Sequence, residues 1–269
     1  MHDIENSARH AAPAFEDAPL QGESGLAYWL ERARRELEPF THLIPATSSP
    51  RGLSRRRTAA TGLALATGVV CLGGLARVAA RPTPSRFDIA TTRLLQRRPS
   101  RTLTRAMVLI STPGFAPLQH VLTFGMMLDL WAFGRRREAF FTMMTMGAGA
   151  TTGIIKIAVG RPRPEPAYVR ATFQFRDNSF PSGHCTHYAS FYGYMFYLAR
   201  RAMPPSALRT AIMATCTSLI ALVAPSRVYL GHHWTSDVLA GEIVGLTYLF
   251  TLVKVYENVF TAEPASQPC

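Results

Sequence analysis

The sequence predicts an all-α protein: a six-helix integral membrane bundle behind an N-terminal tail that is disordered or partly helical. The chain of 269 residues is 48% hydrophobic and 17% charged, and its apolar residues gather in runs long enough to cross a hydrocarbon layer. These runs show neither the alternation typical of strands nor a repeat of 20–50 residues. Because backbone groups in lipid must be paired internally, long apolar runs without strand patterns indicate membrane helices.

The first 57 residues form a polar tail with eight acidic and eight basic residues. Its composition is typical of disorder, and it lacks the apolar core after a basic start that marks a signal peptide. Residues 24–38 are an exception, because their apolar side chains recur at the spacing of an amphipathic helix. We expect this helix either to lie on the membrane surface or to pack against another part of the protein.

A membrane domain over residues 58–254 follows, and a C-terminal tail occupies residues 255–269. The first membrane segment contains nineteen residues without a charge, which matches the thickness of the hydrocarbon core. The basic connector after it includes an interfacial helix around Leu94 and Leu95. The predicted membrane segments are 58–76, 107–133, 139–159, 184–198, 208–223 and 238–253.

Proline and glycine mark the irregular points of these segments. Pro113 and Pro117 delay or kink the second segment, and Pro225 ends the fifth. In the third segment, small residues that include Gly147, Gly149 and Gly153 predict close packing against a neighbouring helix.

The excess of basic over acidic residues lies entirely in the apolar part of the chain. Residues 58–269 hold nine acidic and 21 basic residues, which accounts for the whole net charge of +12. Arginines flank the apolar segments, so we expect contact with anionic lipid headgroups and an anionic substrate, and no nucleic acid partner.

The arginines also predict an orientation in the membrane. Six crossings place both ends of the chain on one face, together with the arginine groups 55–57, 135–137 and 200–201. The positive-inside rule therefore predicts cytoplasmic termini in a bacterial inner membrane, although the connector 77–105 carries eight arginines on the opposite face.

The four cysteines predict neither a disulfide framework nor a metal cluster, because they are scattered and form no C-x-x-C pair. His184 and His187 have a spacing that could ligate a metal, but neither a cysteine nor a carboxylate cluster accompanies them. We therefore expect no metal and no cofactor.

Three short stretches carry residues suited to chemistry: KIAVGRPRP at 156–164, FPSGH at 180–184 and SRVYLGHHWTSD at 226–237. Singly, each fits a structural role, such as a lysine at the membrane edge, a helix cap or a structural histidine. Together they read K-x6-RP, PSGH and SR-x5-H-x3-D. This pattern resembles the type-2 phosphatidic acid phosphatase and vanadium haloperoxidase superfamily, in its membrane lipid phosphatase branch, over roughly residues 58–254.

The residue types of these motifs suit a phosphate ester. Lys156, Arg163 and Arg227 supply cations for the phosphate oxygens, and Arg161 beside the motif adds to the same field. Ser182 and the Gly183 N–H, at the start of a helix, can donate two further hydrogen bonds.

The acid–base residues come from the second and third motifs. His233 and Asp237 share a face if a helix begins before them, and only the spacing separates His233 from His232. The resemblance implies that His233 forms a phosphohistidine and that Asp237 orients its ring. It also implies that His184 protonates the leaving alkoxide and then activates water.

The resemblance implies an integral membrane phosphatase that hydrolyses a lipid phosphate or pyrophosphate without a metal. Its substrate could be undecaprenyl pyrophosphate, phosphatidic acid, phosphatidylglycerol phosphate or the phosphate of lipid A. A lipid phosphotransferase using the same phosphohistidine is an alternative. A vanadate-dependent haloperoxidase fits less well because that branch is soluble, and a non-enzymatic scaffold does not explain the intact motifs. The oligomeric state is left open.

Overall fold

The structure is a computed structural model that describes residues 55–173 and 175–261. These residues form helices and connecting loops, and no strand occurs among them. The helix predicted at 24–38, most of the polar tail and residues 262–269 lie outside the described residues. The last helix continues through residue 254, where the sequence predicted the start of a separate tail.

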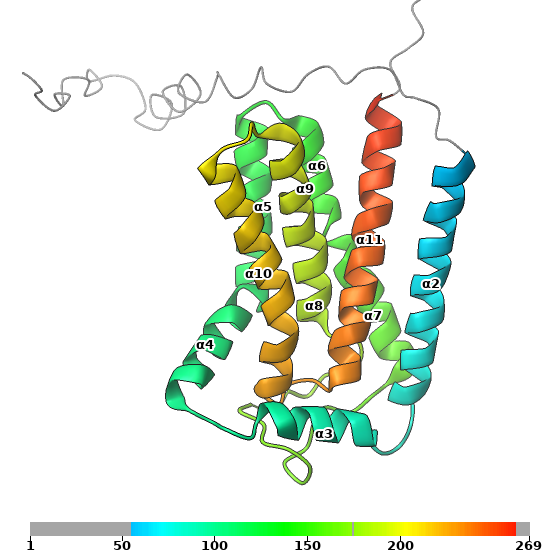
Figure 1. Ribbon diagram of the computed structural model, residues 1–269, viewed down its shortest axis with the longest axis vertical. Helices are drawn as coiled ribbons and strands as arrows, with labels where there is room; N and C mark the ends of the chain where they lie inside the picture. Colours follow the sequence, from blue (N-terminus) through cyan, green and yellow to red (C-terminus); the bar gives the residue numbers. More distant parts are fainter. Residues whose placement is uncertain (1–54, 174, 262–269) are drawn as a thin grey trace, which may run out of the picture. The chain divides into compact units, whose positions relative to one another are not determined.

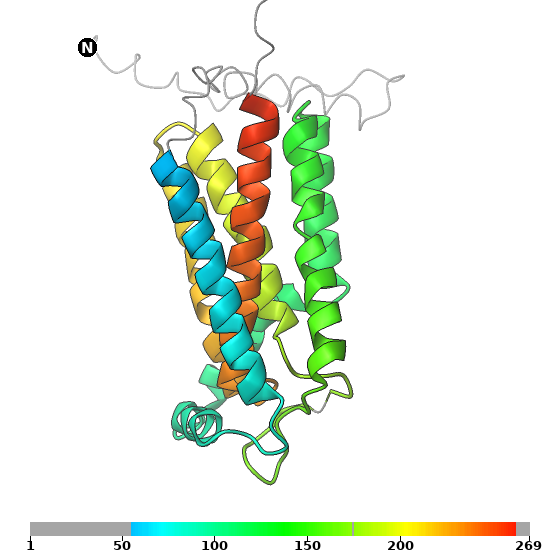
Figure 2. The same ribbon diagram turned by 90° about the vertical axis from the view of Figure 1, so that its right-hand side faces the viewer.

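Six helical passes run along the long axis of the bundle (Figures 1 and 2). The first and last described residues lie at one end, and α3 (Arg86–Leu95) crosses the other end. α4 (Arg101–Ser111) and η1 (Thr112–Gly114) follow α3. The predicted all-α bundle is therefore confirmed. The passes are α2 (Arg55–Ala79), α5 (Leu118–Ala132), α6 with α7 (Arg136–Met144, Gly147–Val159), α8 with η2 and α9 (Gly183–His187, Tyr188–Tyr192, Gly193–Ala202), α10 (Ala207–Tyr229) and α11 (Thr235–Thr261).

The second predicted segment is divided by its prolines. The chain forms α4 and η1 before Pro117, and the long pass α5 begins only at Leu118. Pro113 sits in the 3-10 turn and its missing N–H prevents a continuous α-helix there. The prediction of a delayed helix is correct, but the residues before the prolines form a separate helix and not the start of the same one.

The prediction that Pro225 ends the fifth segment is wrong, because α10 runs through it to Tyr229. Pro225 removes one backbone donor, yet the residues after it stay helical and become buried against the bundle. Ser226 also donates a hydrogen bond from Oγ to the Val223 carbonyl, at 2.7 Å. Arg227 consequently projects from a rigid helix and not from a loop.

The outer surface of the bundle carries large apolar side chains. Ile157 is 82% exposed and Leu109 is 72% exposed, a surface that favours contact with lipid over water. By length and apolarity, two described helices could cross a membrane, α10 and residues 235–257 of α11. Several other passes are broken into shorter helices, and α2 contributes only a shorter apolar stretch, Leu65–Ala79.

Two glycines of α11 bring the second and third motifs together. A Cβ atom on Gly241 would lie 2.5 Å from the Ser182 carbonyl oxygen, and one on Gly245 would lie 2.6 Å from the Thr186 carbonyl. Only glycine permits α11 to approach the start of α8 so closely. The PSGH segment is thus held directly against the helix that carries Asp237.

The predicted close packing of the small residues in the third segment holds at one glycine. A Cβ on Gly147 would lie 2.1 Å from the Tyr248 hydroxyl oxygen of α11. A Cβ on Gly149 or Gly153 would meet no atom within 4 Å, so these two glycines do not pack closely. Both border the cavity described next.

Candidate active site

A cavity of about 620 Å³ opens within the bundle, and all three motifs contribute to its lining. The first motif supplies Lys156 and Arg163, and the third supplies Arg227 and His233. The second motif supplies Gly183 and His184. Ser182 and Asp237, the other two predicted site residues, are fully buried behind this lining.

Two of the three predicted phosphate-binding cations share one carboxylate. Lys156, in the last turn of α7, donates to Asp177 Oδ2 at 2.8 Å and to the Asn178 carbonyl. Arg163 donates to Asp177 Oδ1 through Nη2 at 2.7 Å and through Nε at 3.0 Å. Asp177 is half-exposed and also borders the cavity, so its carboxylate lies where two cations converge.

The third cation, Arg227, is held by aromatic rings and one hydroxyl. Its guanidinium lies 5.0 Å from the centre of the Phe115 ring and 5.8 Å from that of Phe175. Nη1 donates to Ser111 Oγ at 2.7 Å, whereas Nε is buried and has no hydrogen-bond partner in the described part of the chain. Such a donor is free to bind an oxygen of a ligand.

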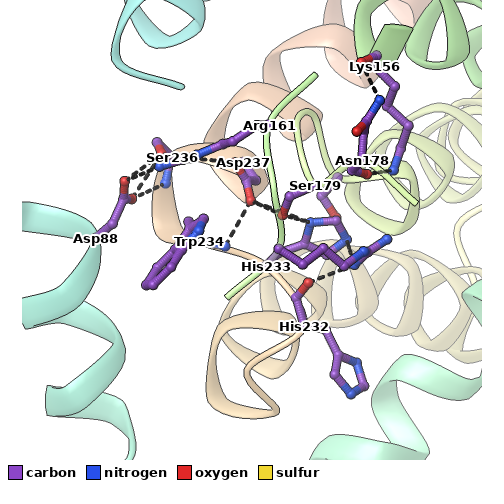
Figure 3. A network of polar contacts seen from close by, with 12 residues as sticks. Asp88, Lys156, Arg161, Asn178, Ser179, His232, His233, Trp234, Ser236 and Asp237 are labelled. Atoms are coloured by element: carbon purple, nitrogen blue, oxygen red, sulfur yellow. Dashed lines mark hydrogen bonds and ion pairs between the residues drawn. The ribbon is translucent and has the colours of Figure 1, made fainter. Parts of the chain in front are cut away.

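His233 lies between the cavity and a buried carboxylate (Figure 3). Its Nε2 is 3.1 Å from Arg163 Nη1, and its Nδ1 is 3.3 Å from Ser179 Oγ. Asp237 Oδ2 is 3.6 Å from Nδ1, too far for a direct hydrogen bond, and accepts a 2.5 Å hydrogen bond from Ser179 Oγ. Ser179 therefore links the carboxylate to the imidazole.

The helical i, i+4 geometry expected for His233 and Asp237 is absent. α11 begins at Thr235, so Asp237 lies in its first turn and His233 lies in the preceding loop. Asp237 instead accepts the Trp234 N–H at 2.9 Å, which caps the start of the helix.

Asp237 also belongs to a buried network that extends to α3 (Figure 3). Arg161 donates to Asp237 Oδ1 at 2.5 Å and to Asp88 Oδ2 at 2.7 Å. Asp88 further accepts from the backbone N–H of Ser236 at 2.8 Å and from its hydroxyl. Arg161 is thus paired with two carboxylates, and it is not among the residues that border the cavity.

His184 occupies the start of α8, where its ring meets Phe115 edge-on at 4.4 Å between centres. Its Nε2 is buried without a hydrogen-bond partner among the described residues, and the same holds for Ser182 Oγ. His232 does not border the cavity. Its Nε2 is 2.8 Å from Thr172 Oγ1, which separates its environment from that of His233.

The cations around the loop histidines control their protonation. Burial, together with the charges of Arg163 and Arg227, lowers the pKa of His233 well below its ordinary value. The ring is therefore neutral at neutral pH, and one nitrogen keeps a lone pair. Partial burial opposes ionisation of Asp177, but the hydrogen bond from Lys156 and the charge of Arg163 lower the pKa of its carboxyl.

Four residues that contact the predicted site residues, or the network around them, were not themselves predicted to belong to the site. Asp177 and Ser179 lie in the loop before the PSGH motif, and nothing in their spacing marked them. Asp88 had one signal, because it is the only acid in a connector with eight arginines. Arg161 is expected from its place beside the motif to add to the anion field, and the structure pairs it with Asp88 and Asp237.

The donor set offers no arrangement for a metal ion in the described residues, since no group of three or more His, Cys, Asp or Glu side chains lies together there. The charged groups that border the cavity are cations, with Asp177 as their counterion. This chemistry suits an oxyanion.

Residues 137–260 match the family model described as PAP2 superfamily. Phosphatidylglycerophosphatase B of Bacillus subtilis (strain 168) is 36% identical over 106 residues, which cover 39% of this chain and 50% of that protein. Lipid A 1-phosphatase of Rhizobium johnstonii is 32% identical over 124 residues, which cover 44% of this chain and 46% of that protein. The chain spans about half the length of these curated relatives.

A solved structure shows the same fold. The crystal structure of a transmembrane PAP2 type phosphatidylglycerolphosphate phosphatase from Bacillus subtilis superposes with a TM-score of 0.64 at 21% identity. The superposition covers 74% of this chain and 98% of that one. The resemblance predicted from the three motifs is therefore confirmed: residues 137–260 match the PAP2 superfamily model, and the helical fold matches that of the solved structure.

Proposed function

We propose that this PAP2-superfamily chain is an integral membrane phosphatase that hydrolyses a lipid phosphate or pyrophosphate through a phosphohistidine on His233. The observation that carries the proposal is the cavity in which Lys156, Arg163 and Arg227 meet a neutral His233. Three cations that line one cavity can stabilise the negative charge of a phosphoryl group in the transition state.

The contacts of the His233 ring favour Nε2 as the attacking atom. Nδ1 faces Ser179 and Asp237, which suits a proton on that nitrogen. Nε2 faces Arg163 across 3.1 Å, where its lone pair accepts a hydrogen bond until a phosphate displaces the guanidinium. In the first step the Nε2–P bond forms and the bond from phosphorus to the ester oxygen breaks, while His184 gives that oxygen a proton.

The second step returns the enzyme to its starting state. His184, now without the proton, takes one from a water molecule, and the water oxygen attacks phosphorus. The P–N bond breaks, inorganic phosphate leaves and His233 becomes neutral again. Asp237 opposes the positive charge that the phosphorylated ring carries, acting through Ser179 at 2.5 Å and 3.3 Å.

Asp177 has a defined place in this scheme. Its carboxylate contacts Lys156 and Arg163, two cations assigned to the phosphate. A bound phosphate therefore replaces the carboxylate on these side chains. The unpaired Arg227 Nε supplies a further donor.

The relatives support a lipid phosphate as the substrate, since their names describe phosphatases of phosphatidylglycerophosphate and of lipid A. We propose that the chain resides in a bacterial inner membrane, with cytoplasmic termini and the cavity mouth on the extracytoplasmic face. A reporter fused after Lys254 tests this orientation. Activity only outside the cytoplasm would contradict it.

The central test uses the full chain in detergent with EDTA and radioactive phosphatidic acid. We expect release of inorganic phosphate and, after rapid quenching, an acid-labile and base-stable label on the protein. His233→Ala should lose both, whereas His232→Gln should retain the label. Label that persists in His233→Ala contradicts the proposal, and label that passes only to an added alcohol identifies a phosphotransferase.

His184 is tested by changing the leaving group. His184→Ala should slow phosphatidic acid hydrolysis by about 10²–10⁴-fold, the usual contribution of a positioned acid–base group. The nitrophenolate group of a nitrophenyl phosphate leaves without protonation. With this substrate the same variant should therefore still phosphorylate His233 and accumulate the intermediate. Equal losses on both substrates would contradict the assigned role.

A further inference from the structure

The cavity continues beyond His184, away from the three cations. Its lining there includes Gln119 and His120 in the first turn of α5 and His187 on α8. The mechanism above uses none of these three side chains. They nevertheless place polar groups inside a bundle whose outer surface is apolar, where an unpaired polar group is costly.

His187 is the best defined of the three. It follows His184 by three residues on the same helix, which places it about 4.5 Å further along the axis. The residue is 9% exposed, and its ring stacks on Phe191 with 5.3 Å between centres. Its Nε2 is buried and has no hydrogen-bond partner among the described residues.

The opposite wall leaves room for a ligand beside these groups. Gly149 and Gly153 of α7 border the cavity, and a side-chain atom on either would meet nothing within 4 Å. The cavity that His187 borders is therefore open beside these two glycines.

The reaction fixes what enters this space. His184 protonates the ester oxygen that leaves with the lipid, so the first atoms of the lipid lie on the His184 side of phosphorus. The alcohol portion of the substrate then extends from His184 toward His187. A glycerolipid presents ester carbonyls within a few bonds of the phosphate, whereas a polyisoprenyl phosphate presents only hydrocarbon there.

We infer that Gln119, His120 and His187 form a hydrogen-bonding subsite for the ester-bearing glycerol backbone of a glycerolipid phosphate and select it over a polyisoprenyl phosphate. This inference rests on the proposed function. A neutral imidazole and an amide can each donate to a carbonyl oxygen. A hydrocarbon chain in the same place leaves these groups unpaired, which is how a polar site rejects an apolar substrate.

The test compares kcat/KM for dioleoyl phosphatidic acid and for a polyisoprenyl monophosphate, with the full chain in mixed micelles. The wild type should prefer phosphatidic acid. His187→Leu and Gln119→Leu should each lower kcat/KM for phosphatidic acid by about tenfold, as expected for one lost buried hydrogen bond. Neither change should lower kcat/KM for the polyisoprenyl phosphate.

Two controls separate selectivity from folding. His187→Gln keeps a hydrogen-bonding side chain and should retain the preference for phosphatidic acid. Thr151→Val makes a polar-to-apolar change on α7 at a residue outside the cavity lining, and it should change neither rate constant. A wild type that hydrolyses neither lipid overturns the proposed function. A wild type that hydrolyses both, with the same ratio in His187→Leu, overturns only this inference.

Discussion

Two groups of polar and charged side chains meet at His233, and they differ in how many of their charges are paired within the protein. The closed cluster, Asp88, Arg161, Ser236 and Asp237, is buried, and fixed protein partners bind its carboxylates. The open cluster, Lys156, Arg163, Arg227 and Asp177, borders the cavity. Among the described residues Arg227 Nε has no hydrogen-bond partner there, and a half-exposed carboxylate balances the other two cations.

How fully a cation is paired distinguishes a positioning group from a ligand-binding group of the same charge. Arg161 and Arg163 lie two residues apart in one motif, yet their guanidinium groups serve opposite sides of the histidine. A buried cation whose donors are already used has none to offer a ligand. A cation that shares an exposed counterion can exchange that counterion for a phosphate.

The largest effect should follow from opening the closed cluster. Arg161→Leu leaves Asp88 and Asp237 buried without their shared cation, which should cost about 3–5 kcal/mol of the free energy of unfolding. Denaturant titration in detergent measures this loss. Arg163→Leu is the matched control and should cost only about 1–2 kcal/mol, because its main counterion is half-exposed. Equal losses in the two variants would remove the distinction between the clusters.

The next effect concerns catalysis by the open cluster. Arg163→Leu should lower kcat/KM for a lipid phosphate by about 10²–10³-fold, the loss typical of removing one donor to a transition-state anion. Arg163→Lys should recover part of the rate, since it restores the charge but not the fork. A variant with normal kcat/KM would show that Arg163 serves Asp177 and not the substrate.

A smaller effect is that the cations of the open cluster make the stability of the fold depend on pH, because they lower the pKa of His232. Burial and the charges of Arg227 and Arg163 lower the pKa of His232 to about 3. The unfolded chain binds this proton near pH 6.5, so stability should fall as pH drops from about 6.5 toward 3. His232→Asn should lose less thermal stability than the wild type between pH 7 and pH 4.5. An identical pH dependence in both proteins would argue against this assignment.

The smallest effect concerns Asp177. Because its carboxylate competes with phosphate for Lys156 and Arg163, Asp177→Asn should lower the inhibition constant for inorganic phosphate by about two- to fivefold. Glu165→Gln, which makes the same charge change at an exposed position of the same loop, is the control. A higher inhibition constant in Asp177→Asn would mean that the carboxylate helps to hold the phosphate.

The open cluster was largely predictable from sequence, whereas the closed one was not. Lys156, Arg163 and Arg227 occupy fixed positions of short motifs, and the residue types themselves indicate phosphate. The contact from Asp88 to Ser236 spans 148 positions and depends on where α3 crosses the bundle, which no local pattern reports. The sequence shows the charge of Arg161 beside its motif, but its partners Asp88 and Asp237 are known only from the structure.

The fold shows the same division. Apolar run lengths predicted six passes, because burial in lipid acts on whole segments. The predicted end of the fifth segment at Pro225 was wrong, because packing of Arg227 and Val228 against the bundle outweighs the backbone donor lost at Pro225. The geometry between His233 and Asp237 depends on where the last helix begins, and its start at Thr235 leaves His233 outside the helix.

The contact between Asp88 and Ser236 also sets how late the buried network beside His233 can form during synthesis of the chain. At about 5–20 residues per second, the ribosome needs roughly 7–30 seconds to cover the 148 positions from Asp88 to Ser236. After Arg163 has been added and before His233 follows, the nascent chain contains Lys156 and Arg163 but neither the proposed nucleophile nor the carboxylate behind it. A chain released before Asp237 has been added lacks the closed cluster, so under the proposed function such a fragment is inert.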